Sequence, residues 1–177
     1  FDGWRGGAAV QPPVPDAPTP AGRRLSVTPM MAKAQADIAY GFDTIARGDP
    51  SYHALSILNN VLGQYALGGR LGDRIREREG MAYYVFSAFE PSVGRGPLVI
   101  RAGVNPANVD RALASIDEEV GRMARDGVTP SELEASRTYL VTSMPRTLET
   151  NAGIAMFLLN AEQHALGLDY DLRLPAL

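Results

Sequence analysis

The sequence contains no cysteine and only two histidines, His53 and His164, in 177 residues. The absence of cysteine excludes disulfides, thiolate zinc sites and cysteine nucleophiles. The two histidines lie far apart in the chain, so no HxxEH or HExxH pair exists and we predict no metal site in this chain. We expect both histidines to be surface or packing residues rather than ligands.

The chain also lacks an excess of positive charge and has no long apolar run. The formal net charge is −3, which argues against a general nucleic-acid binder, because such proteins present a basic surface. No apolar run approaches the roughly 20 residues that a membrane span needs. The lack of cysteine suits a bacterial cytoplasm and a periplasm alike, so the compartment stays open. Hydrophobic residues make up 45% of the chain, enough for an ordinary buried core.

The first 24 residues have no periodic apolar pattern and are rich in proline. Five of the thirteen prolines fall between Pro12 and Pro20, which predicts an extended linker. We expect residues 1–24 to be the end of a preceding domain and its linker, although a disordered tail explains the composition equally well. We expect residues 25–177 to form one domain.

Three segments after residue 24 have the pattern of β-strands. Residues 35–45 alternate apolar and polar side chains, which is typical of a half-buried strand. Residues 82–89 and 98–104 are rich in aromatic and β-branched residues, and the Pro- and Gly-rich segment 90–97 joins them as a hairpin loop. Residues 24–28 are a candidate fourth strand.

Helices are predicted between and after these strands. Asp49 is the expected N-cap of the first, Thr129 and Glu132 form a capping box, and Pro145 is expected to end that later helix near Met144. The acidic run 117–119 on the long amphipathic helix is expected to be a solvated face. The predicted helices cover residues 50–67, 71–79, 109–126, 130–144 and 149–166. This order is not a βαβ alternation, so we predict an α+β fold with two layers: a mostly antiparallel sheet covered on one face by helices.

The segment from Gly68 to Val85, GGRLGDRIREREGMAYYV, concentrates arginines and tyrosines around one turn. Gly80 redirects the chain from helix to strand, and Arg76 and Tyr83 stand on either side of it. A guanidinium and a phenol at such a junction can donate hydrogen bonds to a peptide carbonyl or an oxyanion. The alternative is a solvated Arg/Glu helix followed by an ordinary aromatic strand.

The run ALSILNNVLGQYALGGRLGDRIREREGMAYYV resembles the C-terminal half-domain of the M16 (pitrilysin, or inverzincin) metallopeptidases, in particular the short bacterial M16B members. The family pattern is S-R-L followed by L-R-E-x-x-G-L-A-Y, which appears here as Gly69-Arg70-Leu71 and as IREREGMAY from Ile75 to Tyr83. Residues 35–42 and 128–158 also resemble that half-domain, and the Pro-rich start resembles the segment that joins the two halves.

This resemblance implies the substrate-contacting half of a zinc endopeptidase that acts on peptides or unfolded segments. Its partner would be an HxxEH half in the same chain or in another subunit, and that half would hold the zinc. Family spacing places the substrate-contacting Arg and Tyr seven residues apart, which selects Arg76 and Tyr83 as catalytic and substrate-binding residues. Arg70 and Tyr84 are the fallback substrate-binding residues. A homo- or heterodimer is expected for the full-length protein.

The chain departs from the family pattern at Gly69, where the family has Ser. It also stops at Leu177, where the family continues with a strand and a helix, so the resemblance implies that residues 25–177 are an M16-like half-domain truncated at its C-terminal end. Two other functions remain open. M16-like halves also serve as non-catalytic structural or binding subunits, and a generic α+β interaction module is a third possibility. The sequence does not indicate the cleavage preference.

Overall fold

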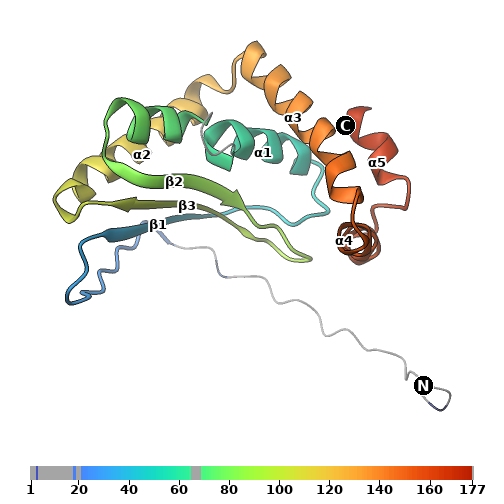
Figure 1. The fold of residues 1–177 in the computed structure, drawn as a ribbon, viewed down its shortest axis with the longest axis horizontal. Coiled ribbons are helices and arrows are strands. Elements are labelled where there is room, and N and C mark those ends of the chain that lie inside the picture. The colour runs from blue at the N-terminus through green and yellow to red at the C-terminus, as the bar shows by residue number, and fades with distance from the viewer. Residues whose placement is uncertain (1–2, 4–17, 19–20, 65–68, 177) are drawn as a thin grey trace.

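A three-stranded antiparallel sheet forms one layer of the molecule, and helices cover one of its faces as the second layer (Figure 1). The computed structural model describes residues 3, 18, 21–64 and 69–176. The predicted α+β architecture is confirmed. Most of the predicted linker, residues 1–24, lies outside the described residues.

The sheet consists of β1 (Ala36–Asp43), β2 (Ala82–Phe89) and β3 (Pro97–Val104) in the order β1-β3-β2. The predicted strands match β1, β2 and β3 closely, because their alternation reflects one face packed against the helices. The hairpin between β2 and β3 is also confirmed, since the two strands pair antiparallel. Residues 24–28 form no strand, so the optional fourth strand is wrong.

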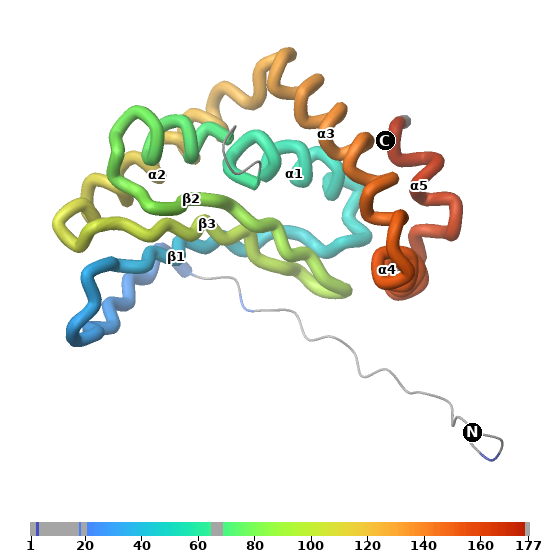
Figure 2. Tube along the Cα trace, in the orientation of Figure 1, coloured from blue at the N-terminus to red at the C-terminus, as the bar shows by residue number. Residues whose placement is uncertain are grey.

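Helices α1 and α2 lie over one face of the sheet (Figure 2). Two π-helical segments, η1 and η2, contact β2 in the same layer. Helix α2 begins and ends at its predicted positions, α3 begins where predicted, and the predicted short charged helix is π-helical. Among the described helices, none is both long and apolar enough to cross a membrane. The helices are α1 (Tyr52–Asn59), η1 (Asn60–Gln64), η2 (Gly72–Arg78), η3 (Pro106–Asn108), α2 (Val109–Asp126), α3 (Pro130–Leu148), α4 (Asn151–Gln163), α5 (Tyr170–Arg173) and η4 (Leu174–Ala176).

The core lies between β3 and the helices η2 and α2. Ile75 of η2, Ile100 of β3 and Ile116 of α2 are completely buried there. Each such side chain contributes about 1.5–3 kcal/mol by leaving water. This packing holds η2 and the strand that follows it against the rest of the sheet.

The start of α1 and the end of α3 differ from the sequence predictions. α1 begins after Ser51 rather than Asp49, and the Asp49 carboxylate accepts a hydrogen bond from the Ser51 N–H in the preceding turn. α3 begins with the predicted capping box at Thr129, but it continues through Pro145 to Leu148. Pro145 is exposed, so water can hydrogen-bond the carbonyl that the ring leaves without its helical donor.

Candidate functional site

A tight turn connects η2 to β2 and carries the two residues that the sequence selects. Gly80 occupies the left-handed region at φ 62°, which a side chain disfavours. The N–H of Glu79 donates to the carbonyl of Arg74, and the N–H of Met81 donates to that of Ile75, at 3.0 Å each. Because Ile75 and Met81 are buried, they anchor both sides of the turn in the core.

Tyr83 lies in a β-bulge at the start of β2. Ala82 pairs with Val104 and Tyr84 pairs with Gly103, so Tyr83 has no partner residue on β3. Strict alternation would place Tyr83 on the helix-covered face with Val85, which is 4% exposed. Instead the tyrosine is 65% exposed, because the extra residue turns it out of the ladder.

Tyr84, the fallback tyrosine, is held on the opposite, uncovered face of the sheet. Its hydroxyl donates to Asp37 Oδ1 of β1 at 2.8 Å. This hydrogen bond raises the pKa of Tyr84 and lowers the pKa of Asp37. The ring covers Gly103, where an added Cβ would come within 2.4 Å of the tyrosine Cε1 atom. Tyr84 therefore has a structural task across all three strands.

Arg76 has the loosest ion pair among the four arginines of this segment. Its Nε lies 3.5 Å from Oε1 of the adjacent Glu77, and its side chain is 43% exposed. In contrast, Arg78 Nη2 lies 2.6 Å from Asp73 Oδ2. Arg76 projects from the last turn of η2, directly before the turn that leads to Tyr83.

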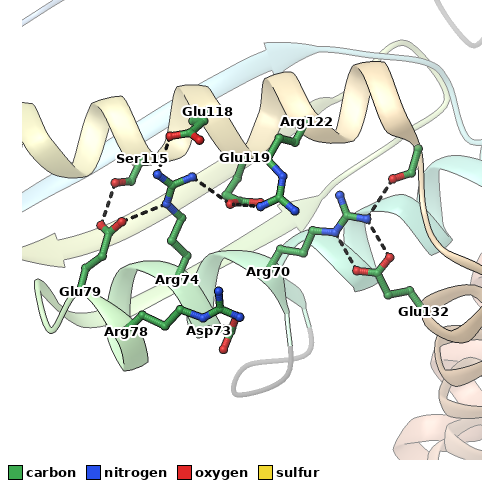
Figure 3. A network of polar contacts seen from close by, with 11 residues as sticks. Arg70, Asp73, Arg74, Arg78, Glu79, Ser115, Glu118, Glu119, Arg122 and Glu132 are labelled. Carbon is green, nitrogen blue, oxygen red and sulfur yellow. Dashed lines mark hydrogen bonds and ion pairs between the residues drawn. The ribbon is translucent and has the colours of Figure 1, made fainter.

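Arg70, the fallback arginine, forms a two-pronged ion pair with Glu132 (Figure 3). Its Nε and Nη2 lie 2.7 Å from the two carboxylate oxygens, and Nη2 also donates to the carbonyl of Gly127 at 2.9 Å. The hydrogen bonds from Arg70 lower the pKa of Glu132 to about 2. The hydrogen-bond donors of Arg70 are thus directed to α3 and to the segment before α3.

Arg74 is the centre of a network that joins η2 to α2 (Figure 3). Its guanidinium pairs with Glu79 and Glu119 at 3.0 Å and also with Glu118. These carboxylates raise the pKa of Arg74. The Ser115 hydroxyl donates to the second oxygen of Glu79 at 2.8 Å.

The expectation of a solvated face at residues 117–119 is wrong for Glu119, which is 1% exposed. Its Oε1 accepts from Arg74 and from Arg122. The spacing carried a signal for this, since Glu119 falls between Ile116 and Met123 on the apolar stripe of the helix. A carboxylate on such a stripe needs a buried cationic partner.

The structure therefore separates the four candidate residues into two pairs. Arg76 and Tyr83 are exposed on either side of the Gly80 turn, whereas Arg70 and Tyr84 are directed to Glu132 and Asp37. The guanidinium and the phenol hydroxyl are hydrogen-bond donors that can bind and polarise a carbonyl, while the neighbouring Glu77 carboxylate is the ion-pair partner of Arg76.

Neither histidine belongs to this site. His53 and His164 line a separate cavity of about 680 Å³, where burial and the charge of Arg47 lower the pKa of both imidazoles. His53 stacks on Tyr170 there, in agreement with the expected packing role. Within the described part of the chain, no group of three His, Cys, Asp or Glu residues could hold a metal ion.

Comparison with known proteins gives one family and several bacterial relatives. The sequence model of the family described as "Peptidase M16 inactive domain" matches residues 1–140. The chain is 33% identical over 116 residues to an uncharacterized zinc protease of Bacillus subtilis, YmxG, covering 66% of this chain and 28% of that protein. It is 33% identical over 146 residues to an uncharacterized zinc protease of Mycobacterium tuberculosis, covering 78% of this chain and 32% of that protein.

A solved structure shares the fold. The crystal structure of a peptidase M16 inactive domain from Pseudomonas fluorescens superposes with a TM-score of 0.74 and 28% sequence identity. The match covers 81% of this chain and 34% of that one. The chain thus spans about a third of the length of the curated relatives it matches.

Proposed function

The chain belongs to the family of peptidase M16 inactive domains, and from that premise we propose that it is the zinc-free, substrate-contacting half of a zinc endopeptidase. Residues 25–177 would form this half-domain. Its substrates would be peptides or unfolded segments, and it would act together with an HxxEH half in the same polypeptide or in a partner subunit.

The bulge at Tyr83 is the observation that supports this proposal most. A large aromatic side chain in phase with buried neighbours is turned into solvent, at the cost of a ladder position. Such bulges commonly re-aim a side chain next to an active site. On the other side of the same turn, Arg76 keeps its guanidinium exposed and only loosely paired with Glu77.

The chemistry of these two groups fits an extended peptide. The Tyr83 hydroxyl would donate a hydrogen bond to the scissile carbonyl oxygen, and this bond would stabilise the negative charge that develops there. The Arg76 guanidinium would donate to neighbouring backbone carbonyls and hold the peptide in register. Both groups contribute by orienting the substrate and by stabilising charge.

The described residues do not fit a zinc site, because their two imidazoles flank a positively charged arginine instead of converging with carboxylates. In this proposal the metal chemistry of hydrolysis belongs to the HxxEH half. This chain then supplies binding and electrostatic stabilisation across a shared chamber.

A reconstitution experiment tests the proposal. Cleavage of an unstructured fluorogenic peptide is measured for this chain, for its HxxEH half and for the two together, with and without a zinc chelator. We expect chelator-sensitive cleavage only when both halves are present. Association of the halves without turnover would instead identify this chain as a non-catalytic binding subunit.

A further inference from the structure

We infer that Glu79 and Arg74 are positioning residues for the Arg76–Tyr83 site, acting through the turn at Gly80 rather than by contact with substrate. This inference rests on the proposed function of that pair. It assigns a role to the polar network between η2 and α2, which the proposed chemistry does not use directly.

Glu79 connects the turn to α2. The residue caps the C-terminal end of η2 and directly precedes Gly80. Its two carboxylate oxygens have different donors: Oε1 accepts from Arg74 Nε at 3.0 Å and Oε2 accepts from the Ser115 hydroxyl at 2.8 Å. One side chain therefore fixes the end of η2 to a helix that packs on the same sheet (Figure 3).

Arg74 reinforces this connection from inside η2. The same guanidinium that binds Glu79 also binds Glu119 of α2, and Glu119 is almost completely buried. Charged hydrogen bonds are stronger away from water. Without Arg74, the buried Glu119 carboxylate would keep only the half-exposed Arg122 as its cationic partner, which would be destabilising. The alternative orientations of η2 are therefore unfavourable, and Arg76 stands only two residues beyond Arg74 on this fixed segment.

A neighbouring ion pair shows what a purely local contact looks like. Arg78 and Asp73 pair at 2.6 Å, but both residues belong to η2 and both side chains are exposed. This pair connects η2 to no other element. Removing Arg78 thus alters the charge of the same helix without touching the link to α2, which makes it a matched control.

The test uses the peptidase assembled from this chain and its HxxEH half. Steady-state kinetics are measured for Glu79→Ala, Glu79→Gln and Arg78→Ala, together with hydrogen exchange at the Met81 amide, which bonds to Ile75 across the turn. We expect Glu79→Ala to lower kcat roughly 10- to 100-fold, the scale of a small misplacement, with KM changed less than about threefold. Exchange at Met81 should become faster.

The conservative variant and the control separate positioning from charge. A glutamine at position 79 can still accept from Arg74 and donate to Ser115, so Glu79→Gln should restore kcat to within about threefold of the parent. Arg78→Ala should match the parent in kcat and in Met81 exchange. Unchanged kcat in Glu79→Ala, or an equal loss in Arg78→Ala, would overturn the inference.

If Glu79→Ala does not fold, Ser115→Ala removes a single hydrogen bond of the same link. We expect a smaller fall in kcat in the same direction, and an unchanged kcat would again overturn the inference. Full activity in Tyr83→Phe would refute the proposed function itself, whatever the Glu79 variants do.

Discussion

Arg70, two residues before η2, is joined to Glu132 in the first turn of α3 by two parallel hydrogen bonds of 2.7 Å. Glu132 also completes the capping box, since its Oε2 accepts from the Thr129 N–H at 2.7 Å. One carboxylate thus caps a helix and fixes an arginine of the chemistry-bearing segment. Protonation of Glu132 should therefore lower the free energy of unfolding of the whole domain.

The first prediction concerns pH. Hydrogen bonds from Arg70 hold the pKa of Glu132 at about 2 in the folded protein, below its ordinary value of 4.5. A lowered folded pKa stabilises the protein above pH 4.5, and this contribution is lost as the pH falls towards 2. We expect Glu132→Gln to cost about 2 kcal/mol at neutral pH and to flatten the loss of stability in acid. Urea unfolding across this pH range measures both effects, and an acid profile as steep as the parent's would contradict the prediction.

The second prediction compares the two adjacent tyrosines. Tyr83→Phe should lower kcat of the assembled peptidase about 10²-fold, the effect of one lost oxyanion donor, with little change in folding. Tyr84→Phe removes the bond to Asp37 and should cost less than about 1 kcal/mol of stability while leaving kcat within twofold. Kinetics and thermal unfolding of both variants give the comparison. The reverse ranking of kcat would move the catalytic role to Tyr84.

The third prediction concerns Arg76. Arg76→Ala should weaken peptide binding about 10-fold, because a charged hydrogen-bond donor to the backbone is removed. Arg76→Lys keeps the charge but loses the planar fork, so it should recover only part of the affinity. Fluorescence anisotropy with a peptide that is not cleaved reports the change. Arg76→Ala with parental affinity would exclude a direct peptide contact.

The fourth prediction concerns the turn itself. An alanine at Gly80 would meet no neighbouring atom within 4 Å, so the cost of Gly80→Ala is confined to the backbone at φ 62°. We expect a loss of about 1–2 kcal/mol. Gly80→Asn should be less destabilising, since asparagine tolerates this region better. Denaturant unfolding of the two variants checks the order, and equal losses would point to a steric cause instead.

Much of the fold was predictable from local patterns in the sequence. Alternation located the strands, the stripe from Val109 to Met123 located α2, and Thr129 with Glu132 located the start of α3. The predicted helix end at Pro145 was wrong. A helix interior usually excludes proline, but on an exposed helix water can hydrogen-bond the carbonyl that has lost its helical donor. Rules for single residues describe averages, and they do not take into account which face of a helix is exposed to solvent.

The site was predictable only in part. The resemblance selected Arg76 and Tyr83, and the residues themselves suggested a junction at Gly80. The bulge could not be predicted from the sequence. Strict alternation places Tyr83 on the same face as buried Val85, and no local pattern indicates the extra residue. The partners of Arg74 were hidden as well, since Glu118 and Glu119 lie more than forty positions further along the chain.

The position of the bulge has a consequence for which tyrosine reaches solvent. Sliding the extra residue by one place along β2 would exchange the roles of the two tandem tyrosines without altering the pairing of Val85 and the residues after it. The Tyr84 ring seated on Gly103 and the hydroxyl bound to Asp37 oppose that slide. Gly103 on β3 and Asp37 on β1 therefore together fix the position of the bulge. The exposure of Tyr83 is determined by contacts of Tyr84 and not by contacts of Tyr83 itself.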